Sequence, residues 1–246
     1  MKVGLFIPCY IDQFYPQVGI ATLELLEKLD VQVEFPANQT CCGQPLANSG
    51  SEQEAEPAYH HFVDLFHHFD HIVMPSGSCT YHVRKHYDRI EQTAEVQHVR
   101  KNTLDLSEFL LDVLNLQSLN ARFPYKVGLH QSCHGLRGLR LGPDSEQNLS
   151  RPSKIQTLLN MVDGIELVDL SRPDECCGFG GTFAVGEPAI SVKMGKDRIA
   201  DHESKGVEVI TAGDMSCLMH LEGIIRRQGK QMKVKHLAEI LNGVQL

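Results

Sequence analysis

The chain of 246 residues carries 31 acidic and 23 basic side chains, a formal net charge of −8. At roughly 100–200 residues per domain, this length corresponds to one large domain or two small ones. An apolar content of 42% excludes a disordered chain. No run approaches the roughly 18 apolar residues of a transmembrane segment, and the acidic balance argues against nucleic acid as a partner.

The first predicted element is a buried strand over residues 3–8. With Met1 and Lys2 in front of it, this stretch resembles the start of a signal peptide, but Asp12 interrupts the apolar run and no cleavage site follows. We therefore expect a cytoplasmic protein, in which thiols stay reduced. Eight cysteines in that setting indicate metal or redox chemistry rather than a disulfide framework.

The remaining elements follow from apolar periodicity. In the first half we expect further strands over 31–35 and 71–75, and helices over 17–29, 52–69, 78–90 and 105–116. In the second half we expect strands near 126–131, 165–170 and 207–212, and helices near 153–162, 188–204, 216–228 and 235–242. Such alternation predicts an α/β fold with mostly parallel sheets and right-handed crossovers.

The two halves of the chain repeat each other. Four segments recur in the same order: 2–9 as 126–133, 41–43 as 176–178, 72–79 as 209–217, and 106–110 as 237–241. An internal duplication explains all four matches. We expect two pseudo-symmetric lobes, one over residues 1–121 and the other over residues 122–246.

The cysteines fall at matching places in the two halves. The first quartet is Cys9, Cys41, Cys42 and Cys79, and the second quartet is Cys133, Cys176, Cys177 and Cys217. Two members of each quartet follow a predicted strand, and the other two form an adjacent pair in a loop. Because the carboxyl ends of parallel strands line the ligand crevice, each quartet is expected to gather at one sheet edge.

The adjacent cysteine pairs favour a multinuclear metal centre. Neighbouring Cα atoms lie about 3.8 Å apart, which is shorter than a disulfide normally spans. A single zinc ion accepts two adjacent residues only with strain, whereas a cluster offers several metal ions. Gly43 and Gly178, which follow the pairs, let the backbone turn sharply there. The alternative, buried structural cysteine, does not account for two matching quartets.

The order Cys, spacer, Cys-Cys-Gly, spacer, Ser/Asp-x-x-Cys resembles the cysteine-rich CCG domain. That domain occurs in heterodisulfide reductase, in the iron–sulfur subunit of glycolate oxidase and in lactate utilisation proteins of type A. The chain is most similar to the last group, because it consists of two such domains and little else. The similarity extends from Cys9 to the final predicted helix.

The resemblance implies one or two [4Fe–4S] clusters held by the eight cysteines. It also implies a subunit of an oxidoreductase complex that, with companion subunits, oxidises L-lactate or a similar 2-hydroxy acid such as glycolate to the 2-oxo acid. The full family motif has a fifth cysteine, and Ser76 and Asp214 occupy its place here. Four thiolates suit an ordinary [4Fe–4S] centre. We expect Ser76 and Asp214 to cap the helices that follow them.

Two alternatives remain open from the residues alone. Four thiolates per half also match the ligand number of structural zinc, which predicts an interaction module without redox function. The third class is thiol–disulfide chemistry of the heterodisulfide reductase kind, although no Cys-x-x-Cys pair is present. No flavin or nicotinamide motif appears, so removal of hydride from a substrate is expected to occur on another chain. His134 and His220 closely follow cysteines and are expected near the crevice.

Overall fold

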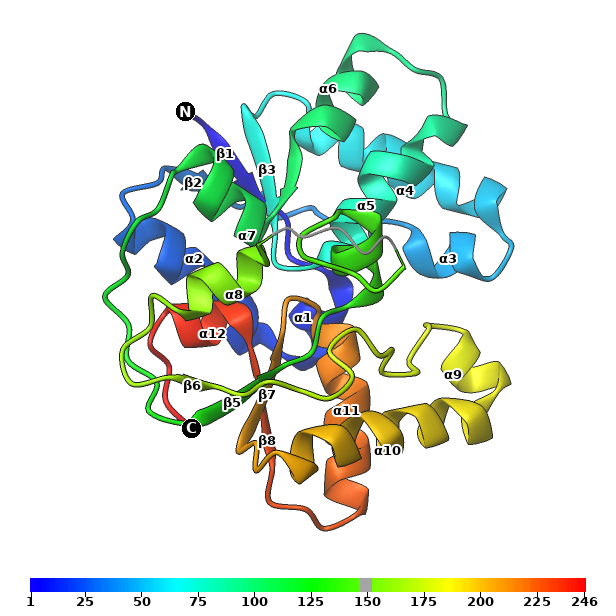
Figure 1. The fold of residues 1–246 in the computed structure, drawn as a ribbon. Helices are drawn as coiled ribbons and strands as arrows, with labels where there is room; N and C mark the ends of the chain where they lie inside the picture. Colours follow the sequence, from blue (N-terminus) through cyan, green and yellow to red (C-terminus); the bar gives the residue numbers. More distant parts are fainter. Residues whose placement is uncertain (147–151) are drawn as a thin grey trace.

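The computed structural model of the protein, drawn in Figure 1, describes residues 1–146 and 152–246. The first half contains strands β1 (Val3–Leu5), β2 (Val33–Glu34), β3 (His71–Met74) and β4 (Thr103–Asp105). The second half contains β5 (Lys126–Leu129), β6 (Glu166–Leu167), β7 (Val209–Ala212) and β8 (Lys233–His236). Each set forms a parallel four-stranded sheet, in the orders β2-β1-β3-β4 and β6-β5-β7-β8. The identical order confirms the predicted α/β fold with two lobes.

Helices connect the strands in both halves. The first half contains α1 (Cys9–Phe14), α2 (Pro16–Lys28), α3 (Gln44–Asn48), α4 (Glu52–Phe66), α5 (Gly77–His86), η1 (Tyr87–Arg89), α6 (Ala94–Asn102), α7 (Leu106–Glu108) and the π-helix η2 (Phe109–Val113). The second half contains the π-helix η3 (His134–Gly138), α8 (Lys154–Leu159), α9 (Phe183–Gly186), α10 (Pro188–Ser204), α11 (Met215–Arg227) and α12 (Leu237–Leu241). None of the helices in these ranges is both long and apolar enough to cross a lipid bilayer.

Two segments that the sequence predicted as helix begin as edge strands. Residues 103–105 form β4 and residues 233–236 form β8, so the prediction of helix over 105–116 and 235–242 was wrong at its start. The reason is local: Asp105 and His236 each form a capping box with the glutamate three residues later, which starts the helix one residue after the strand ends.

The two halves share one hydrophobic core. A single cluster of buried side chains includes Val3 and Leu25 of the first half and Val127 and Leu237 of the second. Helix α12 of the second half packs on α2 of the first, where Figure 1 shows them side by side. A hydrogen bond of 2.6 Å from Lys28 Nζ to the side-chain oxygen of Asn242 closes this contact. The halves are therefore fixed relative to each other.

Candidate metal centre

The first quartet is built from the carboxyl ends of two strands and one loop. Cys9 begins α1, shortly after β1 ends, and Cys79 lies in the first turn of α5 behind β3. Cys41 and Cys42 form the loop before α3, whose N-cap Gly43 adopts a left-handed φ of +88°. The sulfurs of Cys9 and Cys41 lie 3.8 Å apart. The four residues thus come together as the strand–loop order predicted.

The second quartet repeats this arrangement. Cys133 stands at the N-cap of η3 behind β5, and Cys217 lies in the first turn of α11 behind β7. The pair Cys176 and Cys177 precedes Gly178, which has a φ of +90°. The thiols of all eight cysteines are free.

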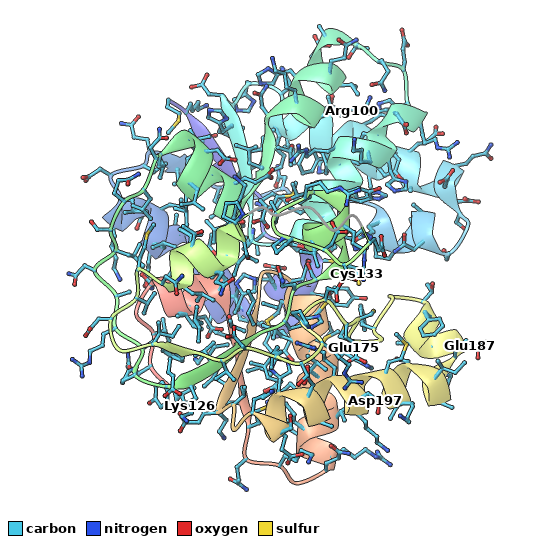
Figure 2. All side chains as sticks on the ribbon, viewed as in Figure 1. Arg100, Lys126, Cys133, Glu175, Glu187 and Asp197 are labelled. Atoms are coloured by element: carbon cyan, nitrogen blue, oxygen red, sulfur yellow. The ribbon has the colours of Figure 1, made fainter. Side chains whose placement is uncertain are left out.

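Both quartets face one common cavity of about 290 Å³. All eight cysteines line it, together with residues from both halves that include Tyr10, Ser76, Ser78, His134, Phe179 and Asp214. Figure 2 shows Cys133 where the N-terminal half above meets the C-terminal half below. The sequence predicted a crevice in each half, and the structure joins the two crevices into one.

Each quartet contains one sulfur that is stabilised as a thiolate. The thiols of Cys42 and Cys9 hydrogen-bond to the sulfur of Cys41 and lower its pKa to about 3. The backbone N–H of Gly43 also donates to this sulfur, at 3.4 Å. In return, the hydrogen bond to Cys41 and burial raise the pKa of Cys9 and of Cys42.

The second quartet has the same electrostatics. Hydrogen bonds from the thiols of Cys133 and Cys177 lower the pKa of Cys176 to about 2, and the N–H of Gly178 donates to it at 3.3 Å. The hydrogen bond to Cys176 and burial raise the pKa of the two donor thiols. A metal cation attracts such clustered sulfurs and displaces their remaining protons, because the thiolate is the ligand form.

Ser76 and Asp214 occupy equivalent positions and meet each other at the contact between the halves. They form an antiparallel bridge, and the Ser76 hydroxyl donates to the Asp214 carboxylate at 2.8 Å. Ser76 caps α5 as predicted, accepting from the N–H of Cys79 at 3.3 Å. Asp214 makes no such cap on α11. Its expected role was wrong because its carboxylate instead accepts from the N–H and hydroxyl of Ser78 in the other half.

Buried histidines near the quartets were not predicted. His82 and His130 are fully buried, and neither ring has a hydrogen-bond partner among the residues that the structure describes. Burial lowers the pKa of each to about 3, so both rings are neutral. A ring nitrogen of His130 lies within 4.8 Å of the sulfurs of Cys177 and Cys217. The position of His82 three residues after Cys79 was a weak indication that it lies near the first quartet. Nothing in the sequence indicated that His130 lies near the second.

The two histidines singled out from the sequence lie differently. His134 lines the cavity. His220 is half-buried beside α10, with its Nε2 3.3 Å from the carbonyl oxygen of Ser191. Its ring centroid lies 6.0 Å from that of the cavity residue Phe179. His220 therefore supports the wall of the cavity from behind.

The donor set fits a metal centre. Sulfur ligands select iron–sulfur clusters, zinc or Cu(I) over hard cations, and each half offers the four thiolates that a [4Fe–4S] cluster takes. Two parallel α/β halves whose strand ends present eight cysteines to one cavity define a protein built of paired cysteine-rich domains.

Comparison with known proteins agrees with this class. The family model described as CCG, cysteine-rich domain, matches residues 3–84 and again residues 127–222. Lactate utilization protein A of Geobacillus sp. (strain WCH70) is 40% identical over 98% of this chain and 99% of its own length. The proteins of that name from Shouchella clausii and Macrococcus caseolyticus are 38% and 39% identical, covering 98% of this chain and 99% and 96% of their own lengths. The chain belongs to the CCG family and, within it, to the group of lactate utilization proteins A.

Proposed function

We propose that the protein is the iron–sulfur electron-transfer subunit of a complex that oxidises L-lactate, or a similar 2-hydroxy acid, to the 2-oxo acid. The observation that carries this proposal is the gathering of two matching cysteine quartets around one cavity. The relatives' names supply the substrate class. Bound to the quartets, [4Fe–4S] clusters would supply reversible one-electron chemistry.

In this proposal the chain's own residues hold and surround the two centres. The eight cysteines are the ligands. Gly43 and Gly178 direct their N–H groups at Cys41 and Cys176, which offsets the negative charge of the thiolates. The positive ends of α5 and α11 lie at Cys79 and Cys217 and act in the same sense. Removal of hydride from the substrate is assigned to a companion subunit.

Zinc is the competing occupant. The site formed by His130, Cys177 and Cys217 has the atom types and the spacing of at most 4.8 Å that a tetrahedral zinc ion accepts. It uses only two of the four thiols of its quartet, however, and the first half has no matching histidine before Cys9. A cluster uses all four thiols in both halves, which favours iron.

Anaerobic purification followed by iron, sulfide and zinc analysis tests the proposal. We expect a brown protein with absorption near 400 nm and about equal amounts of iron and labile sulfide. Cys42→Ser and Cys177→Ser should each remove about half of the iron, whereas Ser49→Ala on the exposed surface should remove none. A colourless protein with stoichiometric zinc and no sulfide contradicts the proposal.

A second test concerns the division of labour among subunits. The purified chain alone should not oxidise L-lactate with an artificial electron acceptor. Activity should appear on addition of the companion subunits. Turnover of L-lactate by the isolated chain would show that the substrate reacts on this subunit, against the proposal.

A further inference from the structure

The side chains beneath the adjacent cysteines differ between the two halves. Gly4 and Gly128 occupy the same place in the central strands β1 and β5, as their pairing with β3 and β7 shows. Two residues further along, Phe6 of the first half therefore corresponds to His130 of the second. An apolar ring and an imidazole thus occupy equivalent places.

The long helices α4 and α10 also differ in this way, with phenyl rings on α4 where α10 has nitrogen-bearing side chains. A Cβ atom built on the glycine of each Cys-Cys-Gly loop would meet Ala55 and Tyr59 of α4 in the first half, and Ser191 and Gly195 of α10 in the second, which pairs the two helices at a constant offset. The same offset pairs Phe62 with Arg198 and Phe66 with His202. Three phenyl rings in the first half are replaced by three nitrogen-bearing side chains in the second.

In the first half these residues form an apolar layer. The ring centroid of Phe6 lies 5.1 Å from that of Phe62 and 5.9 Å from that of Phe66. All three side chains are buried, in the same apolar cluster as Cys42. Such a layer offers no charge and no N–H donor to the sulfurs above it. The buried His82 of the first half lies outside this layer, on α5, and the equivalent place on α11 holds His220, so this histidine position does not distinguish the two halves.

In the second half the equivalent layer is polar and equally buried. His130, Arg198 and His202 are each 0% exposed. The Arg198 guanidinium lies 3.2 Å from the carboxylate of Asp201, which also accepts from the N–H of Ser171. Its Nε and Nη2, like all four ring nitrogens of the two histidines, have no hydrogen-bond partner among residues 1–146 and 152–246.

This layer reaches the second quartet directly. A ring nitrogen of His130 is within 4.8 Å of the sulfurs of Cys177 and Cys217. Burial lowers the pKa of Arg198, attraction to Cys177 works in the opposite sense, and the Arg198 charge in turn helps to lower the pKa of His130. Buried polar groups without partners are rare and need an explanation. Positive charge and N–H groups near cluster sulfurs favour the reduced form, in which the centre carries one more electron.

We propose that Arg198 and His130 make the two centres inequivalent, so that the centre of the second half has the higher reduction potential. Arg198 and His130 are positioning residues that act on the centre through its sulfur ligands. The inference rests on the proposed iron–sulfur function. It adds a direction of electron transfer, from the first centre to the second, because the second centre holds an electron more tightly.

Potentials of single-centre proteins test the inference. Cys177→Ser keeps only the first centre and Cys42→Ser keeps only the second, and each is titrated with spectroscopic detection. We expect the reduction potential of the second centre to exceed that of the first by at least about 59 mV, which is a tenfold shift of the one-electron equilibrium. Equal potentials, or the opposite order, overturn the inference and leave the proposed function intact. Absence of iron and sulfide from both proteins overturns both.

Substitutions in the Cys42→Ser protein identify the residues responsible. His130→Phe introduces the first half's own side chain, and the pair Arg198→Met with Asp201→Asn removes the ion pair without leaving a buried charge. Each should shift the second centre's equilibrium at least fivefold toward the oxidised form with iron content unchanged. Arg198→Lys, which keeps the positive charge, should leave the potential close to that of the Cys42→Ser protein. Phe62→Leu, a change in the first half, should not shift the potential of the second centre. Unchanged potentials, or loss of iron on His130→Phe, contradict the inference, the latter because it would make His130 a ligand.

Discussion

Replacement of Gly43 by alanine should destabilise the protein more than replacement of any glycine in open space. Gly43 has a φ of +88°, and a Cβ atom there would lie 2.5 Å from Cε1 of Tyr59. The Tyr59 ring is buried and stacks on Tyr87 at 4.4 Å between centroids, so it cannot move aside. Left-handed backbone strain of about 1–2 kcal/mol and overpacking of about 1–3 kcal/mol together predict a loss of about 2–5 kcal/mol.

Gly50 provides a matched control. Its φ is also +88°, but no atom lies within 4 Å of a Cβ built there. Gly50→Ala therefore carries only the backbone strain, about 1–2 kcal/mol. Any gain from a stiffer unfolded chain is shared by both variants and cancels in the comparison.

The assay is urea denaturation of metal-free protein followed by circular dichroism. The two variants should differ in unfolding free energy by about 1–3 kcal/mol, the overpacking part alone. In iron-reconstituted protein, Gly43→Ala should also lower the iron content of the first half, because relief of the contact with Tyr59 moves the backbone N–H that donates to the Cys41 sulfur. Equal free energies of unfolding for the two variants would refute the reasoning.

Three further outcomes are expected. Burial raises the pKa of Asp105 to about 7, so the native state binds this proton more tightly than the unfolded chain and loses stability as the pH rises from about 4 to 7. In urea denaturation, the stability of Asp105→Asn relative to wild type should therefore increase by about 2–3 kcal/mol from pH 5 to pH 8. A difference that does not change with pH would contradict this. Ser76→Ala should lower the free energy of unfolding more than Thr93→Ala does. Both variants lose a helix cap worth about 1 kcal/mol, but only Ser76 also donates to the buried Asp214. Equal losses would argue against the contact between the halves. Removal of iron by a chelator should bleach the protein and lower its melting temperature, because ligands of the native state stabilise it; an unchanged transition would mean that the metal does not bind the folded form.

The long elements were predictable because their side chains repeat with a clear period. The stripe of Ala55, Tyr59, Phe62, Phe66 and Phe69 predicted a helix over 52–69. The structure buries all five side chains, but α4, Glu52–Phe66, ends three residues before Phe69. Short elements lacked this signal. Helices α3 and α9, of five and four residues, bury no residue, so no apolar stripe marks them. Strands β4 and β8 lie at sheet edges and pair with a single neighbouring strand, so neither needs the long apolar run that marks a central strand.

The composition of the quartets was predictable, but their meeting in one cavity was not. Cysteine positions relative to strand ends place four thiols at each sheet edge, and this follows from the chain order. How one half faces the other depends on contacts that no local pattern encodes, such as α12 on α2 and Lys28 on Asn242. The role of Asp214 failed for this reason: a helix cap is a local rule, whereas the competing donors came from Ser78 of the other half.

Comparison of the halves separates what geometry requires from what remains free to vary. Gly43 and Gly178 share a left-handed φ and the absence of room for a Cβ atom, so the backbone that presents the adjacent cysteines strongly favours glycine in both halves. The layer beneath has no such constraint, because phenyl rings or an imidazole with a guanidinium fill the space equally well. The two halves thus repeat the cysteine quartet and its glycine but differ in the side chains that surround it. If both quartets hold the proposed clusters, the two centres can therefore differ in potential although their cysteines are the same.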